Sequence, residues 1–202
     1  MTSIVLAGGK SSRLGSNKVM LTVGGTSLIQ RVLDRLAGIS SEIIVVTANE
    51  GETPCAPSDR VRIVTDIYPG KGPLGGIYTG LVAASNPRAA VVGCDMPFLS
   101  TALLRYMMRV SPEAEAVIPR LGDNVEPLCA VYSKSCLSAI HDLLMRDELR
   151  IRRLLDSVVV RYVERAEIDR HDPERLSFFN VNTQLDLDTA KRLAAESGLA
   201  AM

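Results

Sequence analysis

Short apolar runs recur along the first half of the chain and are separated by segments with helical periodicity. The runs are rich in β-branched residues, as in strands buried on both faces of a parallel sheet, and they span residues 4–7, 42–47, 61–65 and 89–93. Apolar side chains at helical spacing follow Ser27, a candidate N-cap, and the predicted helices span residues 28–37, 77–84 and 100–110. This alternation predicts an α/β fold with a Rossmann-like, doubly wound and mainly parallel sheet.

The second half of the chain is less regular. Further strands are predicted at residues 116–119, 128–132 and 158–163, and further helices at residues 135–144 and 149–155. A last helix is expected after Thr183, because Thr183 and Asp186 have the spacing of a capping pair. Neither a repeat nor a low-complexity segment divides the chain, so we expect residues 1–202 to form a single domain in which the second half extends the sheet.

Glycine or polar residues follow each of the four strands predicted in the first half. Ligands of open α/β sheets bind beyond the carboxyl ends of the strands. The sequence therefore predicts that one edge of the sheet gathers four groups, namely the Gly8–Gly9 loop, Asn49, Asp66 and Asp95.

The loop after the first strand combines glycines with positive charge. Gly8 and Gly9 allow a tight turn that brings backbone N–H groups close to an anion. The first 33 residues contain no acidic side chain, although the whole chain has a formal net charge of zero; their basic residues are Lys10, Arg13, Lys18 and Arg31. This pattern predicts a phosphate-binding loop in which Lys18 reaches over the bound phosphates. Arg13 is expected either to do the same or to pair with a carboxylate.

Two common phosphate-binding motifs do not fit this loop. A P-loop has four residues between its first glycine and its Gly-Lys pair, whereas five residues separate Gly9 from Gly15, and Ser16 stands where the lysine should be. The Gly-x-Gly-x-x-Gly fingerprint of dinucleotide-binding folds is not present there either. The alternative interpretation is an ordinary strand-to-helix turn with solvated basic side chains.

The composition argues against several classes of function. The 202 residues include 23 basic and 23 acidic side chains, a balance that argues against general nucleic-acid binding. No apolar run approaches the roughly 18 residues of a membrane span, and no secretory signal is evident, so we expect a cytoplasmic protein with no membrane partner. The four cysteines show no C-x-x-C spacing and the two histidines are far apart, so free thiols are expected and a zinc site is not.

Two aspartates at the predicted edge suit metal or nucleoside binding. Mg²⁺ is typically held by one or two carboxylates together with substrate phosphates. Asp95 comes straight after a buried strand and is the candidate metal ligand, with a turn or helix-capping role as the alternative. Asp66 is expected to join the metal site, to hold the nucleoside or to close a turn.

Amide and glycine residues supply the remaining candidates. Asn49 suits a base or ribose contact or, as the alternative, a turn. Asn180 and Asn182 flank Val181, and alternate residues of an extended segment point the same way, which suits a polar heterocycle. The loop at residues 72–76, Gly-Pro-Leu-Gly-Gly, is expected to offer its backbone to a base or a pyrophosphate, or to form a tight turn.

With these residues assembled, the chain resembles the molybdenum cofactor guanylyltransferases along essentially its whole length. Four motifs carry the resemblance, at residues 6–18 (Leu-Ala-Gly-Gly-Lys-Ser-Ser-Arg-Leu-Gly-Ser-Asn-Lys), 72–75 (Gly-Pro-Leu-Gly), 94–98 (Cys-Asp-Met-Pro-Phe) and 179–183 (Phe-Asn-Val-Asn-Thr). The resemblance implies a fold like that of the nucleotide-diphospho-sugar transferases. It also implies that GTP is bound by the counterparts of Leu6, Ala7, Gly8, Lys18, Asn49 and Asp66.

The resemblance further implies the reaction. GMP would pass from GTP to the terminal phosphate of molybdopterin, and pyrophosphate would be released. The backbone at Gly8 and Gly9, with Lys18, Arg13 and Mg²⁺ on Asp95, would stabilise the charge on the phosphates. The N-terminal half would bind the nucleotide, and the C-terminal half would cover the acceptor, with Asn180 and Asn182 toward the pterin.

Three other functions are weighed against this one. A cytidylyltransferase for the same cofactor usually has alanine at the position of Gly8, and a sugar-phosphate nucleotidyltransferase usually has Pro-Leu after the loop arginine. A non-catalytic GTP sensor would not need Lys18 and Asp95. We expect no nucleic-acid partner, but transient contact with proteins that deliver molybdopterin or receive the product.

Overall fold

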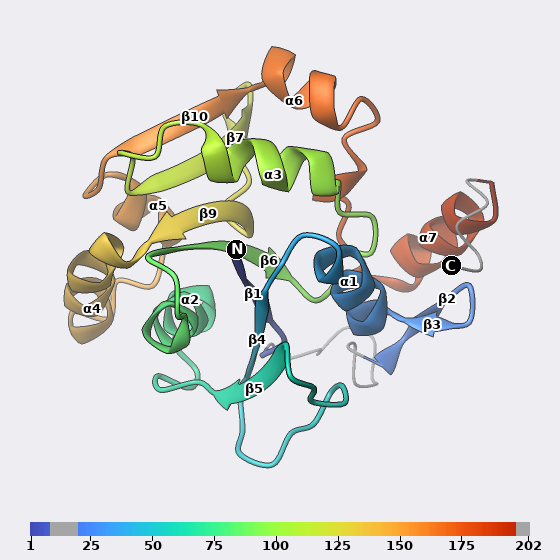
Figure 1. The fold of residues 1–202 in the computed structure, drawn as a ribbon, viewed down its shortest axis with the longest axis horizontal. Coiled ribbons are helices and arrows are strands. Elements are labelled where there is room, and N and C mark those ends of the chain that lie inside the picture. Colours follow the sequence, from blue (N-terminus) through green and yellow to red (C-terminus); the bar gives the residue numbers. More distant parts are fainter. Residues whose placement is uncertain (9–19, 197–202) are drawn as a thin grey trace.

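Residues 1–8 and 20–196 are described by the computed structural model. Within them, eight strands form one sheet (Figure 1), namely β1 (Thr2–Leu6), β4 (Glu42–Thr47), β5 (Val61–Thr65), β6 (Arg88–Gly93), β7 (Ala116–Leu121), β8 (Asn124–Val125), β9 (Cys129–Ser133) and β10 (Val160–Glu164). The main path has the order β10-β7-β9-β6-β1-β4-β5, and β8 pairs with β7. On this path β9 is antiparallel to both of its neighbours, and all other pairs are parallel. The predicted α/β class with a mainly parallel sheet is therefore confirmed.

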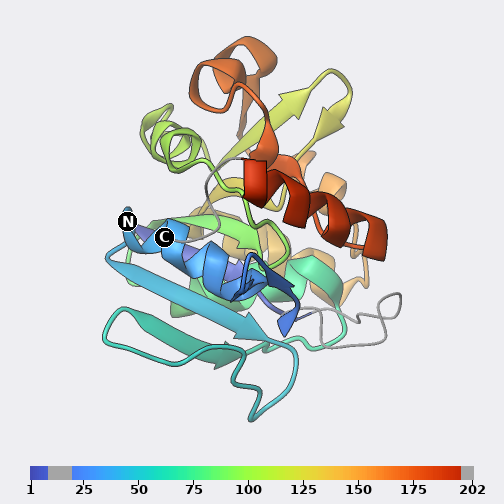
Figure 2. The same cartoon turned by 90° about the vertical axis from the view of Figure 1, so that its right-hand side faces the viewer.

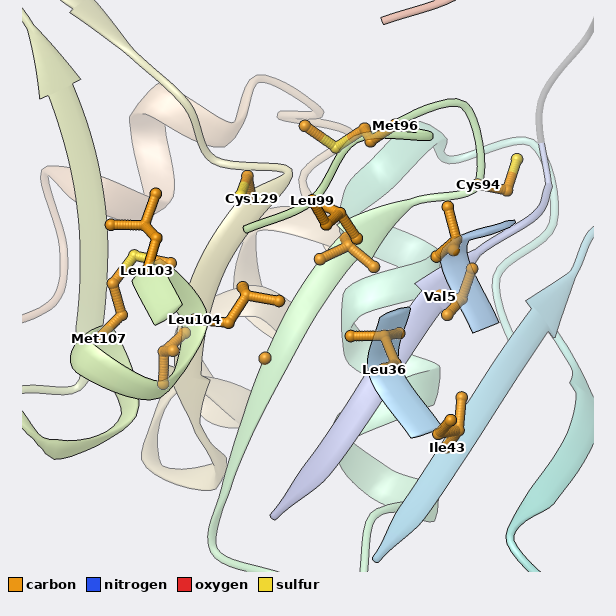
Figure 3. Close-up of a cluster of buried hydrophobic side chains, with 14 of the residues drawn as sticks. Val5, Leu36, Ile43, Cys94, Met96, Leu99, Leu103, Leu104, Met107 and Cys129 are labelled. Atoms are coloured by element: carbon orange, nitrogen blue, oxygen red, sulfur yellow. The ribbon is translucent and has the colours of Figure 1, made fainter. Parts of the chain in front are cut away.

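Helices cover both faces of the sheet (Figure 1). One face packs against α1 (Leu28–Ala37), α3 (Thr101–Arg109) and α6 (Arg165–His171), and the other against α2 (Gly72–Ala83), α4 (Leu137–Met145) and α5 (Ile151–Leu155). Alternate residues of a strand face opposite sides, so Val5 of β1 joins the first core and Ile4 the second. Figure 3 shows part of the first core, where Val5 and Ile43 from the sheet meet Leu36 of α1.

A third apolar cluster joins the β2–β3 region to the C-terminal part of the described chain. The short hairpin β2 (Thr22–Val23) and β3 (Thr26–Ser27) packs against the last helix, α7 (Gln184–Glu196), as Figures 1 and 2 show. Val23, Phe98 and Val181 are buried in this cluster. The guanidinium of Arg31 donates to the carbonyl of Val23 at 3.0 Å and lies over the ring of Phe98. The C-terminal segment is thereby held against the N-terminal half.

The element predictions agree with the structure over most of the chain. The strands at residues 42–47 and 61–65 are confirmed residue by residue, and the Ser27 hydroxyl accepts from the backbone N–H of Gln30 as the predicted N-cap. The short elements that were not foreseen include the β2–β3 hairpin, β8 and α6. Helix α6 begins with a capping box between Glu164 and Glu167 inside a stretch whose polar character concealed its helical pattern. The cysteines are free thiols, as expected.

The predicted start of α2 was wrong. The helix begins at Gly72 instead of near Ile77, because a proline is accommodated in the first turn of a helix. Two of its glycines lie against β1 with no room for a side chain. A Cβ on Gly76 would lie 2.9 Å from Cδ2 of Leu6, and one on Gly80 would lie 2.9 Å from Cδ1 of Ile4 and closer still to its Cγ2. The glycines therefore serve a close helix–strand approach.

Glu42 organises the edge of the sheet opposite the carboxyl ends of the parallel strands. Its carboxylate accepts from the Thr2 hydroxyl at 2.7 Å, from the Arg62 guanidinium at 2.7 Å and from both the N–H and the hydroxyl of Ser85 at 2.9 Å. Burial alone would raise the pKa of Glu42, but these hydrogen bonds outweigh it and lower the pKa to about 2. One side chain thus joins β1, β4, β5 and the connection between α2 and β6.

In the described part of the chain, no helix combines the length and the apolar character that crossing a bilayer requires.

The substitution Gly80→Ala tests the close approach of α2 to β1. Alanine is more favourable than glycine in a helix by about 1 kcal/mol. Its methyl group would, however, overlap Ile4 in a packed core, and such overpacking costs about 1–3 kcal/mol of stability. We expect a net loss of stability in denaturant unfolding and a lower Tm. Gly38→Ala is the matched control, because a Cβ there meets no atom within 4 Å. A Gly80→Ala protein more stable than the parent would contradict this account.

The substitution Glu42→Gln tests the hydrogen-bonded carboxylate. Because the pKa is lowered on folding, ionised Glu42 stabilises the protein above pH 4.5, and this contribution, at most about 3 kcal/mol, disappears as the pH falls toward 2. We expect Glu42→Gln to reduce the unfolding free energy at pH 7 and to flatten its fall between pH 4.5 and 3. Glu148→Gln, at an exposed position, should leave both unchanged. Equal pH dependence in the parent and Glu42→Gln would refute the assignment.

Candidate functional site

The carboxyl ends of four parallel strands lie side by side. Strand β1 is central, because Leu6 pairs with Val46 of β4 on one side and with Gly93 of β6 on the other. Just beyond the strand ends, the N–H of Ala7 donates to Val46 at 2.9 Å and the N–H of Cys94 donates to Leu6 at 3.1 Å. The predicted groups that follow these strands therefore lie at one edge of the sheet.

The end of β1 supplies the first three candidate residues, Leu6, Ala7 and Gly8. Leu6 is partly buried beneath Gly76, and Ala7 is buried. Gly8 is exposed, and a Cβ there would lie 3.1 Å from the backbone nitrogen of Ala48, so the chain passes close to the end of β4. Three further candidates, Gly9, Arg13 and Lys18, lie outside the described residues, and their roles stay predictions.

Asp66 fastens the end of β5 to α2. Its Oδ1 accepts from the backbone N–H of Tyr68 at 3.0 Å and from the hydroxyl of Thr79 at 2.8 Å, and the same hydroxyl accepts from Ile67. A Cβ on Gly75 would lie 2.9 Å from Oδ2 of Asp66, so the first turn of α2 leaves room for this carboxylate. Residues 72–76 are accordingly a helical turn and not the loop that the sequence suggested.

Asp95 lies where the two halves of the chain meet. It follows β6, and its carboxylate lies over Gly93, which has no room for a Cβ. Its backbone carbonyl accepts a hydrogen bond of 3.0 Å from the N–H of Val181. The structure therefore brings Asn180 and Asn182 beside Asp95 from far along the sequence.

The segment around the asparagine pair is held in place locally. Val181 is buried, whereas Asn180 is partly exposed and donates through Nδ2 to the carbonyl of Phe178 at 3.0 Å. The predicted capping pair is confirmed, because Thr183 N–H donates to Asp186 at 2.8 Å and Asp186 N–H donates to the Thr183 hydroxyl at 3.2 Å. The cap fixes the point where the extended segment ends.

Asn49 lies farther out on the same edge. It is exposed, and its Nδ2 donates to Oε1 of Glu52 at 2.6 Å within the turn after β4. Its side chain thus makes a local contact in the loop after β4, and its contact with a base or ribose stays a prediction.

A cavity of about 570 Å³ opens beyond the ends of β7 and β10. Its lining combines two arginines with aromatic and aliphatic side chains: Leu121, Gly122, Arg165, Glu174, Arg175, Leu176, Phe178 and Phe179. Both arginines form ion pairs with Asp169. Nε of Arg165 lies 3.6 Å from its Oδ2, and Nη1 of Arg175 lies 3.7 Å from its Oδ1. Sequence reasoning missed this cavity, although Phe179 belongs to a motif that it singled out. Two of its lining residues, Phe178 and Phe179, directly precede the asparagine pair in the sequence.

The described residues contain no group of three or more His, Cys, Asp or Glu side chains arranged to hold a metal ion. Asp95 offers carboxylate oxygens, which suit a hard cation that takes its other ligands from phosphates and water. The place of Asp95 at the carboxyl ends of the parallel strands fits the binding of such a cation.

Comparison with known proteins gives the family. The model of the MobA-like NTP transferase domain matches residues 3–165. A protein from Pelotomaculum thermopropionicum, named "Probable molybdenum cofactor guanylyltransferase", is 37% identical over 196 residues, which are 97% of this chain and 94% of that protein.

Solved structures agree with this result. Molybdopterin-guanine dinucleotide biosynthesis protein A from Archaeoglobus fulgidus superposes with a TM-score of 0.86 at 26% identity, covering 97% of this chain and 100% of that one. The 2-C-methyl-D-erythritol 4-phosphate cytidylyltransferase from Thermus thermophilus shares the fold alone, with a TM-score of 0.70 at 18% identity over 96% of this chain and 98% of that one. The chain is thus a nucleotidyltransferase of the MobA-like family and belongs with the molybdenum cofactor guanylyltransferases.

Proposed function

We propose that the protein transfers GMP from GTP to the terminal phosphate of molybdopterin, which yields the guanine dinucleotide cofactor and pyrophosphate. The observation that carries this proposal is the hydrogen bond from Val181 to Asp95, because it joins the loop after β6, next to the end of β1, to the segment that leads into the cavity. The names of the relatives support the same reaction.

The nucleotide lies along the ends of β1, β4 and β5. The N–H groups at Gly8 and Gly9 approach its phosphates, and Lys18 and Arg13 contribute positive charge. Asn49 and Asp66 lie farther along the edge, where Asp66 keeps one oxygen for Thr79 and Tyr68. The base and ribose lie on this side.

Transfer is a substitution at the α-phosphorus of GTP. An oxygen of the acceptor phosphate forms the new P–O bond, and the bond to the bridging oxygen of the β-phosphate breaks, so that pyrophosphate leaves with the electron pair. The acceptor oxygen is already anionic, and no strong general base is needed. Catalysis then depends on orientation and on charge stabilisation.

Asp95 holds the metal ion in this scheme. Magnesium is the candidate, since one carboxylate together with substrate phosphates and water is a typical ligand set for it. The bound ion supplies positive charge to the phosphates. Asp95 also orients Val181 through its backbone, so the same residue aligns the acceptor segment.

The acceptor lies on the C-terminal side, within the single domain that we propose for the whole chain. The cavity offers Phe178 and Phe179 to a ring system and Arg165 and Arg175 to negative charge. Asn180 and Asn182 lie between this cavity and Asp95. Proteins that deliver molybdopterin or receive the product are proposed as transient partners.

The substitution Asp95→Asn tests the reaction and the metal ligand together. Loss of one ionised carboxylate next to the phosphates should reduce turnover at least about a hundredfold, while the fold is retained. The measurement is pyrophosphate release with Mg²⁺ and molybdopterin, with GTP, CTP or ATP as the donor. Asp59→Asn, at an exposed loop position, is the matched control and should keep the parental rate.

Each rival function predicts another result. Activity with CTP alone would assign the protein to the cytidylyltransferases of the same cofactor. Tight GTP binding without turnover would indicate a sensor. Full activity of Asp95→Asn would remove this residue from the proposed mechanism.

A further inference from the structure

Glu126 lies on the connection between β8 and β9, at the same edge of the sheet as Asp95. Its N–H donates to the carbonyl of Pro119 at 3.0 Å, which extends the β7–β8 ladder by one pair. Two residues later, the carbonyl of Leu128 accepts from the N–H of Gly93 at 3.1 Å. Glu126 is therefore held between the end of β7 and the end of β6.

The ladder also fixes the face of the sheet to which Glu126 belongs. Directly opposite residues of antiparallel strands share a face, so Glu126 is on the face of Pro119 and hence of Leu121, which lines the cavity. Burial raises the pKa of the Cys129 thiol, and the negative charges of Asp172 and Glu126 raise it further, which places the carboxylate of Glu126 near Cys129. Cys129 and Met96, the residue after Asp95, belong to the same buried core, part of which Figure 3 shows.

Several carboxylates of the described residues accept hydrogen bonds, whereas that of Glu126 does not. Glu42, Asp66, Glu167 and Asp172 each accept at least one hydrogen bond. Glu126 is partly buried, and within residues 1–8 and 20–196 no hydrogen bond or ion pair reaches its side chain. Burial raises its pKa with no compensating donor. A carboxylate desolvated in this way gains most from a ligand that brings its own N–H groups.

A pterin has such groups. Its 2-amino-4-oxopyrimidine edge presents two adjacent N–H donors, which match the two oxygens of one carboxylate. We propose that Glu126 binds this edge of the molybdopterin acceptor and so selects and orients the pterin. The inference rests on the proposed function, because it assumes a pterin as acceptor.

Guanine presents the same kind of edge, so the position of Glu126 decides between the two ligands. The nucleotide edge is built from β1, β4 and β5, on one side of β6. Glu126 is on the other side of β6, where β7 ends and β9 begins, and on the same face of the sheet as Leu121, which lines the cavity. The pterin is therefore the ligand within its reach.

The substitution Glu126→Gln replaces one acceptor oxygen with a donor at nearly constant shape. We expect the KM for molybdopterin to rise about tenfold or more, while the KM for GTP and the Tm stay close to those of the parent. Pyrophosphate release is measured with each substrate varied in turn at saturating concentration of the other. Glu148→Gln is the matched control at an exposed position.

Three results would overturn the inference while the proposed function stands. The first is an unchanged KM for molybdopterin. The second is a raised KM for GTP instead, which would show that Glu126 binds guanine. The third is an equal rise of both KM values with a lowered Tm, which would indicate a structural role.

If the parent protein does not turn over with molybdopterin, the proposed function fails by itself. Binding of a soluble pterin, followed by its own fluorescence, then tests Glu126 without turnover. Weaker binding by Glu126→Gln than by the parent and Glu148→Gln would support the contact, and equal binding would refute it.

Discussion

The close approach of α2 to β1 is the constraint on which the proposed nucleotide side of the site depends. With glycine at positions 76 and 80, the helix lies directly on Leu6 and Ile4. Its first turn then reaches the end of β5, where Gly75 leaves room for the carboxylate of Asp66. Larger side chains at these positions would lift the helix off the sheet and would separate Asp66 from Thr79. The positions of α2 and of Asp66 at this edge of the sheet thus depend on glycines that have no side chain.

The proposed acceptor side depends on a different kind of contact. Here the C-terminal segment crosses the chain and hydrogen-bonds to the backbone of Asp95 through Val181. Burial of Val181 with Phe98 and Val23 stabilises this contact. The extended segment ends at Thr183, which caps the last helix. A backbone bond and an apolar cluster thus hold this segment beside Asp95. Buried Val181 alternates with Asn180 and Asn182, whose contact with the acceptor stays a prediction.

The sequence predicted the sheet edge well and the second half of the site poorly, for physical reasons. Continuous β-branched runs identify buried strands, and a parallel sheet places their ends together, so Asp66 and Asp95 could be located without coordinates. The start of α2 was missed because glycines usually indicate a loop, whereas here they permit tight packing. The cavity and Glu126 gave no sequence signal, since a carboxylate without donors is a property of tertiary packing. Lys18 and Arg13, which the motif singles out, remain predictions.

The reversed strand β9 also has a consequence for how the protein is made. In space β9 lies between β6 and β7, but in the chain it follows both. During synthesis the outer edge of β6, an apolar strand, has no partner until residues 129–133 have emerged and inserted beside it. An unpaired apolar edge is a template for pairing with another chain. The nascent protein is therefore open to such pairing from the time β6 is made until β9 closes the sheet.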